Sequence, residues 1–398
     1  GVNCYDPAKT GLTGMKAAGN AAAADRYEVT KALTPTLDGL ARDGVMFTNY
    51  YCTSAICTPA RYTMLTGRYA ERSAELLDAH PAGSQANIWF NTDITRTETT
   101  LPKTLKAAGY TTCITGKWHN FPVALELPMR ELTDNNAPDA DPRAPEVRSR
   151  IEKAYAMGFE FLKEGFGWDR VDRLMTNNCE PVRPFPLNAN NTEWIIEGAL
   201  GFLEDRPDAD DPFFLYVAIN APHSRYDKRR LEEDPRGTRA GLLDEPPEGM
   251  PPRESAQQRA AAAGLNENVA EGVWIDDAVN AVQKKLHEIG AEEETLFIFT
   301  TDHPTVGKGS THLGRIPLIV SWPGRLPEHT VHDRIVSQTD LAPTILDLAG
   351  CEIPEDMRTD GESFAPLLRD ADAQNDGAHG DSERDTAGSY AREQVMLA

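Results

Sequence analysis

The stretch PFFLYVAIN, residues 212–220, decides the fold class of this chain. Its side chains are apolar almost without interruption, so a strand formed here would be buried on both faces, as in a parallel sheet covered by helices. The stretches TLFIFTTD (295–302) and IPLIVSW (316–322) repeat the pattern. We therefore expect three buried strands of the parallel kind.

Helix and strand signals alternate along the rest of the chain. Residues 34–44 and 101–109 each combine an early proline with a closing glycine, which predicts a helix. The β-rich residues 45–50 and 110–115 predict a strand after each of these helices, and a third helix is expected over about 274–289. The alternation predicts an α/β fold with a mixed, mostly parallel sheet between helices.

Three stretches predict irregular structure. Residues 128–145 are rich in Asn, Asp and Pro, and residues 227–259 are rich in Pro and charged side chains. We expect both to run as loops over the strand ends. Residues 370–385 contain mainly Asp, Gly and Ala and predict a linker or tail. The chain therefore divides into one large α/β domain over residues 1–369 and an acidic linker over residues 370–398.

The acidic composition limits the partners that we expect. The 398 residues include 62 acidic and 40 basic side chains, a formal net charge of −22. Non-specific binding to nucleic acid or to an anionic membrane surface needs a basic surface, so neither partner is expected. No apolar run reaches the ~18 residues of a membrane-spanning helix, and no signal-peptide pattern is visible.

The residues that follow the expected strands carry the chemistry, because ligands of an open α/β sheet bind beyond the carboxyl ends of its strands. In Cys57-Thr58-Pro59-Ala60-Arg61, Thr58 can serve as the N-cap of a helix and Pro59 as its first residue. Cys57 then lies just before a helix N-terminus, where backbone N–H groups favour an anion, and Arg61 can reach the same position. Taken alone, the pattern is equally that of a buried structural cysteine.

Other polar residues follow three of the expected strands. Lys117 and His119 come after the first strand and point to the same side if the segment is extended. His223 comes directly after the second. Asp302 and His303 end the third, where a carboxylate and an imidazole can ligate a metal. Each of these residues, taken singly, also suits a structural role.

Together these motifs resemble those of the sulfatase family. The family signature is matched by Cys57-Thr58-Pro59-Ala60-Arg61 with Thr66-Gly67, and it is followed in the family's order by Gly116-Lys117-Trp118-His119, Ala221-Pro222-His223, Asp302-His303 and Asp340-Leu341-Ala342-Pro343-Thr344. The resemblance extends from Thr34 to about Leu368. It implies an alkaline-phosphatase-like fold and a sulfuric ester hydrolase that cleaves a sulfate monoester of a carbohydrate or an aryl alcohol.

The resemblance implies a modified nucleophile at Cys57. A formylglycine-generating or radical-type maturase would oxidise this cysteine to formylglycine, an aldehyde whose hydrate carries two hydroxyls. One hydroxyl attacks sulfur and displaces the alcohol; the other then loses its proton, and the intermediate returns to the aldehyde as sulfate leaves. A serine would remain as a stable sulfate ester.

The resemblance also implies roles for the other residues. Lys117 contacts the sulfate, His119 holds the second hydroxyl, and His223 binds the sulfate and protonates the leaving oxygen. Lys308, in Gly307-Lys308-Gly309-Ser310-Thr311, resembles a second sulfate-binding lysine. Asp302 and His303 match a pair that binds one calcium ion. The implied catalytic set is Cys57, Arg61, Lys117, His119, His223 and Lys308, whose cations would stabilise developing negative charge.

The sequence departs from the family pattern in its metal ligands. The family places two adjacent aspartates before the signature, and here Asp6 stands alone. We expect the first strand and both aspartates to precede Gly1, and the C-terminal subdomain to be largely absent. Because Asp302 and His303 are too few ligands for calcium, this chain is expected to bind calcium poorly and to have weak or no activity. The family resemblance implies a periplasmic or secreted protein.

Three alternatives remain open. One is a phosphonate monoester or phosphodiester hydrolase of the same superfamily, and another is an inactive sulfatase-like fragment. A zinc site built from His119, His223, His303 and His312 is disfavoured, because the neighbouring lysines would repel a metal.

Overall fold

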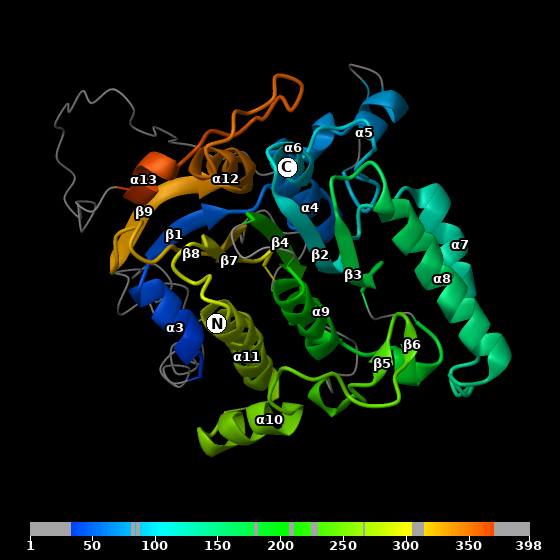
Figure 1. Cartoon of the computed structure of the whole chain (residues 1–398). Helices are drawn as coiled ribbons and strands as arrows, with labels where there is room; N and C mark the ends of the chain where they lie inside the picture. Colours follow the sequence, from blue (N-terminus) through cyan, green and yellow to red (C-terminus); the bar gives the residue numbers. More distant parts are fainter. Residues whose placement is uncertain are drawn as a thin grey trace, which may run out of the picture. The chain divides into compact units, whose positions relative to one another are not determined.

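The computed structural model describes most of the chain, in two compact units. One unit comprises residues 1–90 and 290–398, and the other comprises residues 91–289. The described residues are 33–80, 84, 88–178, 182–206, 211–223, 230–265, 267–304 and 314–369. Figure 1 shows the elements of both units along the sequence.

The first unit contains a four-stranded mixed sheet in the order β7-β8-β1-β9. Its strands are β1 (Val45–Tyr51), β7 (Phe297–Thr300), β8 (Arg315–Ser321) and β9 (Thr330–Ser337). β1 pairs with β9 in parallel, whereas β8 runs antiparallel to both β1 and β7. β7, β1 and β9 therefore run in one direction and β8 runs against them, so the parallel direction predicted for residues 316–322 is wrong, and β7 differs from the prediction only in pairing with this reversed strand. A continuous apolar run reports burial on both faces of a strand and says nothing of its direction.

Short helices accompany this sheet. They are α3 (Pro35–Arg42), α4 (Cys57–Thr66), α5 (Ala74–Ala79), α12 (Leu341–Leu348) and α13 (Ala365–Arg369). α3 packs on β1 and β8, and α4 packs on α12. The core beneath them joins Phe47 and Tyr50 of β1 to Leu318 of β8 and to Phe364, all almost completely buried.

The Asp340–Thr344 motif has a structural role in this unit. Ser337 and Asp340 form a capping box around a single 3₁₀ turn, with the Ser337 N–H 2.8 Å from Asp340 Oδ2. The Thr344 hydroxyl donates to the Asp340 carbonyl at 2.6 Å and accepts from the Phe364 N–H at 2.9 Å. These bonds join the start of α12 to the segment that leads into α13.

The second unit contains a parallel three-stranded sheet in the order β3-β2-β4. Its strands are β2 (Thr111–Lys117), β3 (Arg170–Met175) and β4 (Phe213–Ala218), and a small hairpin is formed by β5 (Gly237–Thr238) and β6 (Gly241–Leu242). β4 lies inside the stretch 212–220, so the parallel strand predicted there is confirmed, although its residues up to Val217 are half-buried rather than buried. β3 was not predicted, because three of the six residues in its sequence RVDRLM are charged and it has neither a continuous apolar run nor a strict alternation.

Longer helices cover this sheet. They are α6 (Leu101–Ala107), α7 (Val123–Asp134), α8 (Pro145–Lys163), α9 (Thr192–Glu204), α10 (Arg253–Ala262) and α11 (Glu267–Glu288). α9 packs on all three strands, α7 lies beside α8, and α10 lies beside α11 (Figure 1). The predicted α/β class, with mixed sheets between helices, is confirmed.

Two of the stretches predicted as irregular contain helices. α7 includes Pro128, and α10 begins at Arg253, directly after Pro252. In α7 the buried face formed by Met129 and Thr133 outweighs the hydrogen bond that Pro128 removes. In α10 the prolines lie before the first helical residue, where a missing N–H costs nothing.

Gly116 holds the end of β2 in the conformation that presents Lys117. Its φ is +91°, and a Cβ built here would overlap the Ala218 carbonyl oxygen of β4. Gly109 has a similar φ of +94°, but nothing lies within 4 Å of the place where its Cβ would be. Alanine substitutions at the two glycines therefore distinguish the cost of a positive φ, which both share, from the cost of a steric clash, which only Gly116 has.

We expect Gly116→Ala to lower the free energy of unfolding by about 2 kcal/mol more than Gly109→Ala does. Both variants carry the cost of a positive φ, and only Gly116→Ala adds a clash with the neighbouring strand. Urea denaturation of the two variants beside the wild type measures the difference. Equal losses would show that the approach of β4 does not constrain this position.

Candidate active site

Cys57 is the first residue of α4 rather than the residue before it. The N-cap is Ile56, whose carbonyl accepts the Ala60 N–H at 3.2 Å. The predicted helix start, with Thr58 as N-cap and Pro59 as first residue, is therefore wrong by two residues. The helix begins earlier because Cys57 and Thr58 already adopt helical conformation. It ends at Gly67, whose φ is +68°.

Four of the predicted site residues come together in the first unit. The Cys57 Sγ lies 3.0 Å from His303 Nε2, and Arg61 Nε donates to Asp302 Oδ2 at 3.0 Å. The His303 N–H donates to Asp302 Oδ1 at 2.9 Å. Thiol, imidazole and carboxylate ligand atoms all lie within 4.8 Å of one another. Helix α4 and the segment after β7 thus form one buried polar cluster.

Backbone and amide contacts fix this cluster in place. His303 Nδ1 lies 2.9 Å from the Pro304 carbonyl oxygen, which orients the ring. Gln338, fully buried, donates to the Asp302 carbonyl at 2.6 Å and accepts the Thr53 N–H at 3.3 Å. Sequence reasoning missed Gln338, because it follows β9 as an uncharged residue without a motif of its own.

The ionisation of the cluster reflects two opposed effects. Burial lowers the pKa of His303, but its hydrogen bond with Cys57 and the charge of Asp302 raise it more, so the net direction is upward. Burial raises the pKa of the Cys52 and Cys113 thiols to about 12. Those two thiols stay protonated and unreactive at neutral pH. Cys57 differs from them in having an imidazole as its partner.

Two more predicted residues lie at one edge of the second unit's sheet. Lys117 is the last residue of β2, is buried, and donates from Nζ to Asn178 Oδ1 at 2.5 Å. His223, half-buried, follows β4. Because β2 and β4 are parallel, with Gly116 opposite Ala218, both side chains belong to the carboxyl edge of the sheet.

His119 does not continue the strand. Its φ of +68° is left-handed, and β2 carries a bulge between Thr115 and Gly116. The expectation that Lys117 and His119 share one side of an extended segment is therefore wrong, because the backbone turns at His119. His119 itself is buried.

The structure thus groups the predicted residues into two sets. Cys57, Arg61, Asp302 and His303 belong to the first unit, and Lys117, His119 and His223 belong to the second. Lys308 and His312 lie outside the described residues, as does Asp6.

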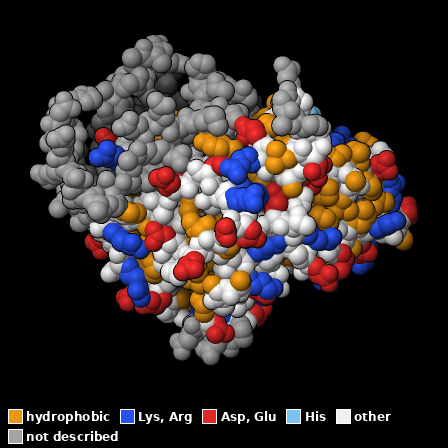
Figure 2. Space-filling view, turned by 90° about the horizontal axis from the view of Figure 1, so that it is seen from above, with side chains coloured by type: hydrophobic (Ala, Val, Ile, Leu, Met, Phe, Trp, Pro, Cys, Tyr) orange, Lys and Arg blue, Asp and Glu red, His pale blue; other side chains and the backbone are white. Residues whose placement is uncertain are grey.

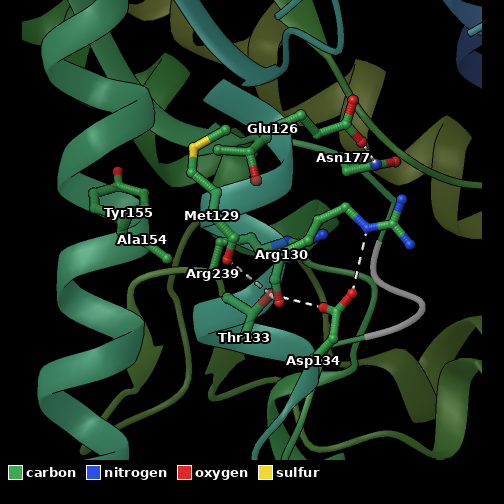
Figure 3. Close-up of a pocket in the computed structure, with 10 residues that line it drawn as sticks. Glu126, Met129, Arg130, Thr133, Asp134, Ala154, Tyr155, Asn177 and Arg239 are labelled. Carbon is green, nitrogen blue, oxygen red and sulfur yellow. Dashed lines mark hydrogen bonds and ion pairs between the residues drawn. The ribbon is translucent and has the colours of Figure 1, made fainter. Parts of the chain in front are cut away.

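A small cavity lies beside α7 and α8 in the second unit (Figure 3). It measures about 20 Å³, room for one water molecule. Its lining comes from α7, from α8, from the residues after β3 and from Arg239. Asn177 Nδ2 donates to Glu126 Oε1 at 2.8 Å, and Arg239 donates to the Asn178 carbonyl. The cavity therefore adjoins the asparagine that holds Lys117. Sequence reasoning missed these residues because residues 128–145 were expected to be irregular and β3 was not recognised.

The surface charge is dispersed. Figure 2 shows acidic side chains interspersed with basic ones over the visible face, rather than gathered into one patch.

Among the described helices, none is long and apolar enough to cross a membrane.

Comparison with known proteins identifies the family. The sulfatase family model matches residues 17–351, and the chain belongs to the sulfatase family. It is 28% identical over 369 residues to the uncharacterized sulfatase YdeN of Escherichia coli K12, covering 86% of this chain and 58% of that protein. It is 27% identical over 365 residues to N-acetylgalactosamine-6-sulfatase of Rattus norvegicus, covering 84% and 61%. The chain therefore spans about 60% of these relatives.

Solved structures share the fold. One is a protein in complex with its substrate D-glucosamine-2-N,6-O-disulfate, with a TM-score of 0.52, 18% identity, and 87% and 77% of the two chains covered. Another is a phosphonate monoester hydrolase of Agrobacterium radiobacter, with a TM-score of 0.50, 18% identity, and 87% and 75% covered. The predicted alkaline-phosphatase-like fold is confirmed.

Glu126, which lines this cavity, makes the free energy of unfolding depend on pH. Burial raises its pKa, and this outweighs the lowering by Arg130, Asn177 and Arg239. Because the folded pKa exceeds the unfolded one, the folded state holds the proton longer. This carboxyl therefore reduces stability progressively as pH rises through the interval between the two pKa values.

We expect Glu126→Gln to be more stable than the wild type at about pH 7, with the difference shrinking toward about pH 4. The amide oxygen keeps the bond from Asn177 and removes the buried charge. Urea denaturation at both pH values measures the trend. Glu160→Gln, at an exposed position of α8, controls for the change in net charge. A difference that grows toward low pH would contradict the assignment.

Proposed function

We propose that this chain carries the catalytic site of a sulfuric ester hydrolase, with residues 1–369 as its catalytic domain. The observation that carries the proposal is the Cys57 cluster: in a chain of the sulfatase family, the signature cysteine lies within hydrogen-bond distance of His303, beside the Arg61–Asp302 pair. A sulfate monoester is the substrate class that this family membership supports.

The position of Cys57 suits an anionic substrate group. As the first residue of the ten-residue helix α4, it lies where unsatisfied backbone N–H groups and the helix dipole favour negative charge. Arg61 adds a buried guanidinium one turn along the helix. A sulfuryl group placed at Cys57 would therefore meet preorganised positive charge.

Further roles are proposed for the second unit and for Lys308. Lys117 and His223 supply sulfate contacts from the carboxyl edge of β2 and β4, and Lys308 supplies another. His119 assists the release of sulfate, and His223 protonates the leaving oxygen. Asn178 positions Lys117, since its side-chain oxygen accepts the lysine's hydrogen bond.

Cys57 is proposed to be converted to formylglycine by a formylglycine-generating or radical-type maturase. The hydrated aldehyde supplies a hydroxyl nucleophile and a second hydroxyl through which sulfate is released. The site suits this change, because Sγ already lies beside an imidazole that can accept or return a proton.

Calcium is proposed as the metal of the converted site, with Asp302 as its carboxylate ligand and His303 beside it. Calcium prefers six to eight oxygen ligands, and this cluster supplies one carboxylate, so water and substrate oxygens would contribute to its shell. When bound, the ion supplies positive charge that polarises the sulfuryl oxygens.

A sulfated carbohydrate is the proposed substrate. The relatives include N-acetylgalactosamine-6-sulfatases, and a structural neighbour was solved with a sulfated glucosamine. The phosphonate monoester hydrolase shares the fold alone, so hydrolysis of phosphonates or phosphodiesters is the less favoured reading.

Mass spectrometry tests the nucleophile directly. After co-expression with a maturase, the tryptic peptide 43–61 should lose the mass that separates CH2SH from CHO, and fragmentation should place the change at Cys57. Cys52 lies in the same peptide and is the internal control, because its buried thiol should remain unmodified. An unchanged Cys57 in maturase-treated protein would refute the proposed mechanism.

Steady-state kinetics test the site residues. On 4-nitrophenyl sulfate, Cys57→Ala should abolish turnover, and Arg61→Ala should lower kcat by roughly 100-fold, as for loss of one preorganised charge. Cys351→Ser, in the half-buried segment after α12, should retain activity. Thermal melts confirm that each variant is folded. Faster turnover of 4-nitrophenyl phosphate or of a phosphonate ester than of the sulfate would favour the alternative activity.

A further inference from the structure

Asn178 is held at three points in the second unit. Its side-chain oxygen accepts from Lys117 Nζ at 2.5 Å, its N–H donates to Asn177 Oδ1 at 2.7 Å, and its carbonyl accepts from Arg239. We infer that Asn177 and Arg239 are positioning residues for Lys117, and that they act by fixing the backbone of Asn178 from both sides. This inference rests on the proposed function, in which Lys117 contacts the sulfate.

The pairing of two strands brings Asn178 to the end of β2. Lys117, the last residue of β2, lies opposite Met175, the last residue of β3. The Trp118 N–H donates to the Met175 carbonyl at 3.1 Å, so the two chains remain joined beyond the strands. Asn178 follows Met175 closely in the sequence, and its side chain therefore lies within reach of the lysine ammonium.

Asn177 is itself fixed in one orientation. Because the backbone N–H of Asn178 can only donate, Asn177 must present its side-chain oxygen to it. The side-chain nitrogen of Asn177 then faces Glu126 and donates to Oε1 at 2.8 Å. Figure 3 shows Asn177 directed toward this carboxyl group of α7. Glu126 therefore sets the orientation of the amide that holds Asn178.

Arg239 reaches Asn178 from a different element. It lies in the turn between β5 and β6, and only 8% of its surface is exposed. The adjacent Ala240 packs against a core cluster that includes Met175 of β3. The hairpin is thus fastened to the end of β3, and its turn places a guanidinium inside the protein.

The buried charge of Arg239 favours a role in hydrogen bonding over simple space filling. A buried guanidinium is costly unless its N–H groups find acceptors, and an apolar side chain of similar volume would fill the same space at lower cost. The Asn178 carbonyl is one such acceptor. The charge of Arg239 also acts on Glu126, whose pKa it lowers against the larger effect of burial. Both supports of Asn178 therefore belong to one network.

Fixing Asn178 restricts the position of the lysine ammonium. The side chain of Lys117 is a point charge on a flexible stem, so burial alone leaves several rotamers open to it. An acceptor whose own N–H and carbonyl are both held gives the ammonium one preferred position. Charge that is already in place stabilises a transition state without reorganisation during the reaction. Loss of either support should therefore weaken catalysis without unfolding the protein.

Chemical labelling of Lys117 tests the inference on the unmodified chain, expressed without a maturase. Limited acetylation with acetic anhydride, followed by digestion at acidic residues and mass spectrometry, gives the labelling rate of each lysine. Asn177→Ala and Arg239→Met should each raise the rate at Lys117 by about tenfold, as for loss of one buried hydrogen bond. Lys284, exposed on α11, should be labelled at the same rate in every variant.

Further variants separate positioning from a general loss of stability. Glu126→Gln keeps the acceptor for Asn177 and should label like the wild type, whereas Glu126→Ala should label faster at Lys117. Ile151→Val shortens a side chain of α8 in a different core cluster, and it should lower stability without exposing Lys117. Urea denaturation of each variant measures how much stability it has lost.

Steady-state kinetics after co-expression with a maturase test the consequence for catalysis. On 4-nitrophenyl sulfate, Asn177→Ala and Arg239→Met should lower kcat/KM by about one to two orders of magnitude, as for a misplaced catalytic group. Glu126→Ala should also lower kcat/KM, and Glu126→Gln should restore it. Ile151→Val should remain close to the wild type.

An unchanged labelling rate at Lys117 in either Asn177→Ala or Arg239→Met would overturn the inference. A rise that Ile151→Val reproduces would overturn it as well, and so would faster labelling with an unchanged kcat/KM. A wild type without sulfatase activity would instead refute the proposed function. The labelling rates would still report whether Asn177 and Arg239 hold Lys117 in place.

Discussion

The ion pair between Arg61 and Asp302 is the interaction on which the first unit's site depends. It joins helix α4 to the segment after β7, across 241 residues of sequence, and both side chains are largely buried. Removing one partner of such a pair leaves an uncompensated charge, at a cost of about 3–5 kcal/mol. The pair therefore fixes Asp302, which in turn aligns His303 beside Cys57.

In the second unit, the direction of the strands brings the candidate site residues together. Parallel pairing of β2 with β4 brings Lys117 and His223 to one edge of the sheet, although they come from distant parts of the sequence. A glycine with positive φ lets the two strands approach closely at the end of β2. Lys117 is thereby held as a buried side chain with Asn178 as its acceptor, and is not a solvated surface lysine.

Cys57 lies at the start of α4 in one cluster with His303 and with the Arg61–Asp302 ion pair. Local positive charge from Arg61 and the helix N-terminus also allows an anion to bind to a chain whose net charge is −22.

The sequence by itself determined the α/β class, the strand within residues 212–220 and the motifs that carry the proposed site residues, because apolar runs and short motifs are local properties. It could not determine strand direction, the helix start at Cys57, the turn at His119 or the supporting contacts of Gln338 and Asn178. These depend on pairing and packing between segments far apart in the chain, such as β7 with β8 and Gln338 with Asp302. Tertiary structure decided them because a buried polar group or an unpaired strand edge needs a hydrogen-bond partner. The fold supplies that partner from a distant part of the sequence.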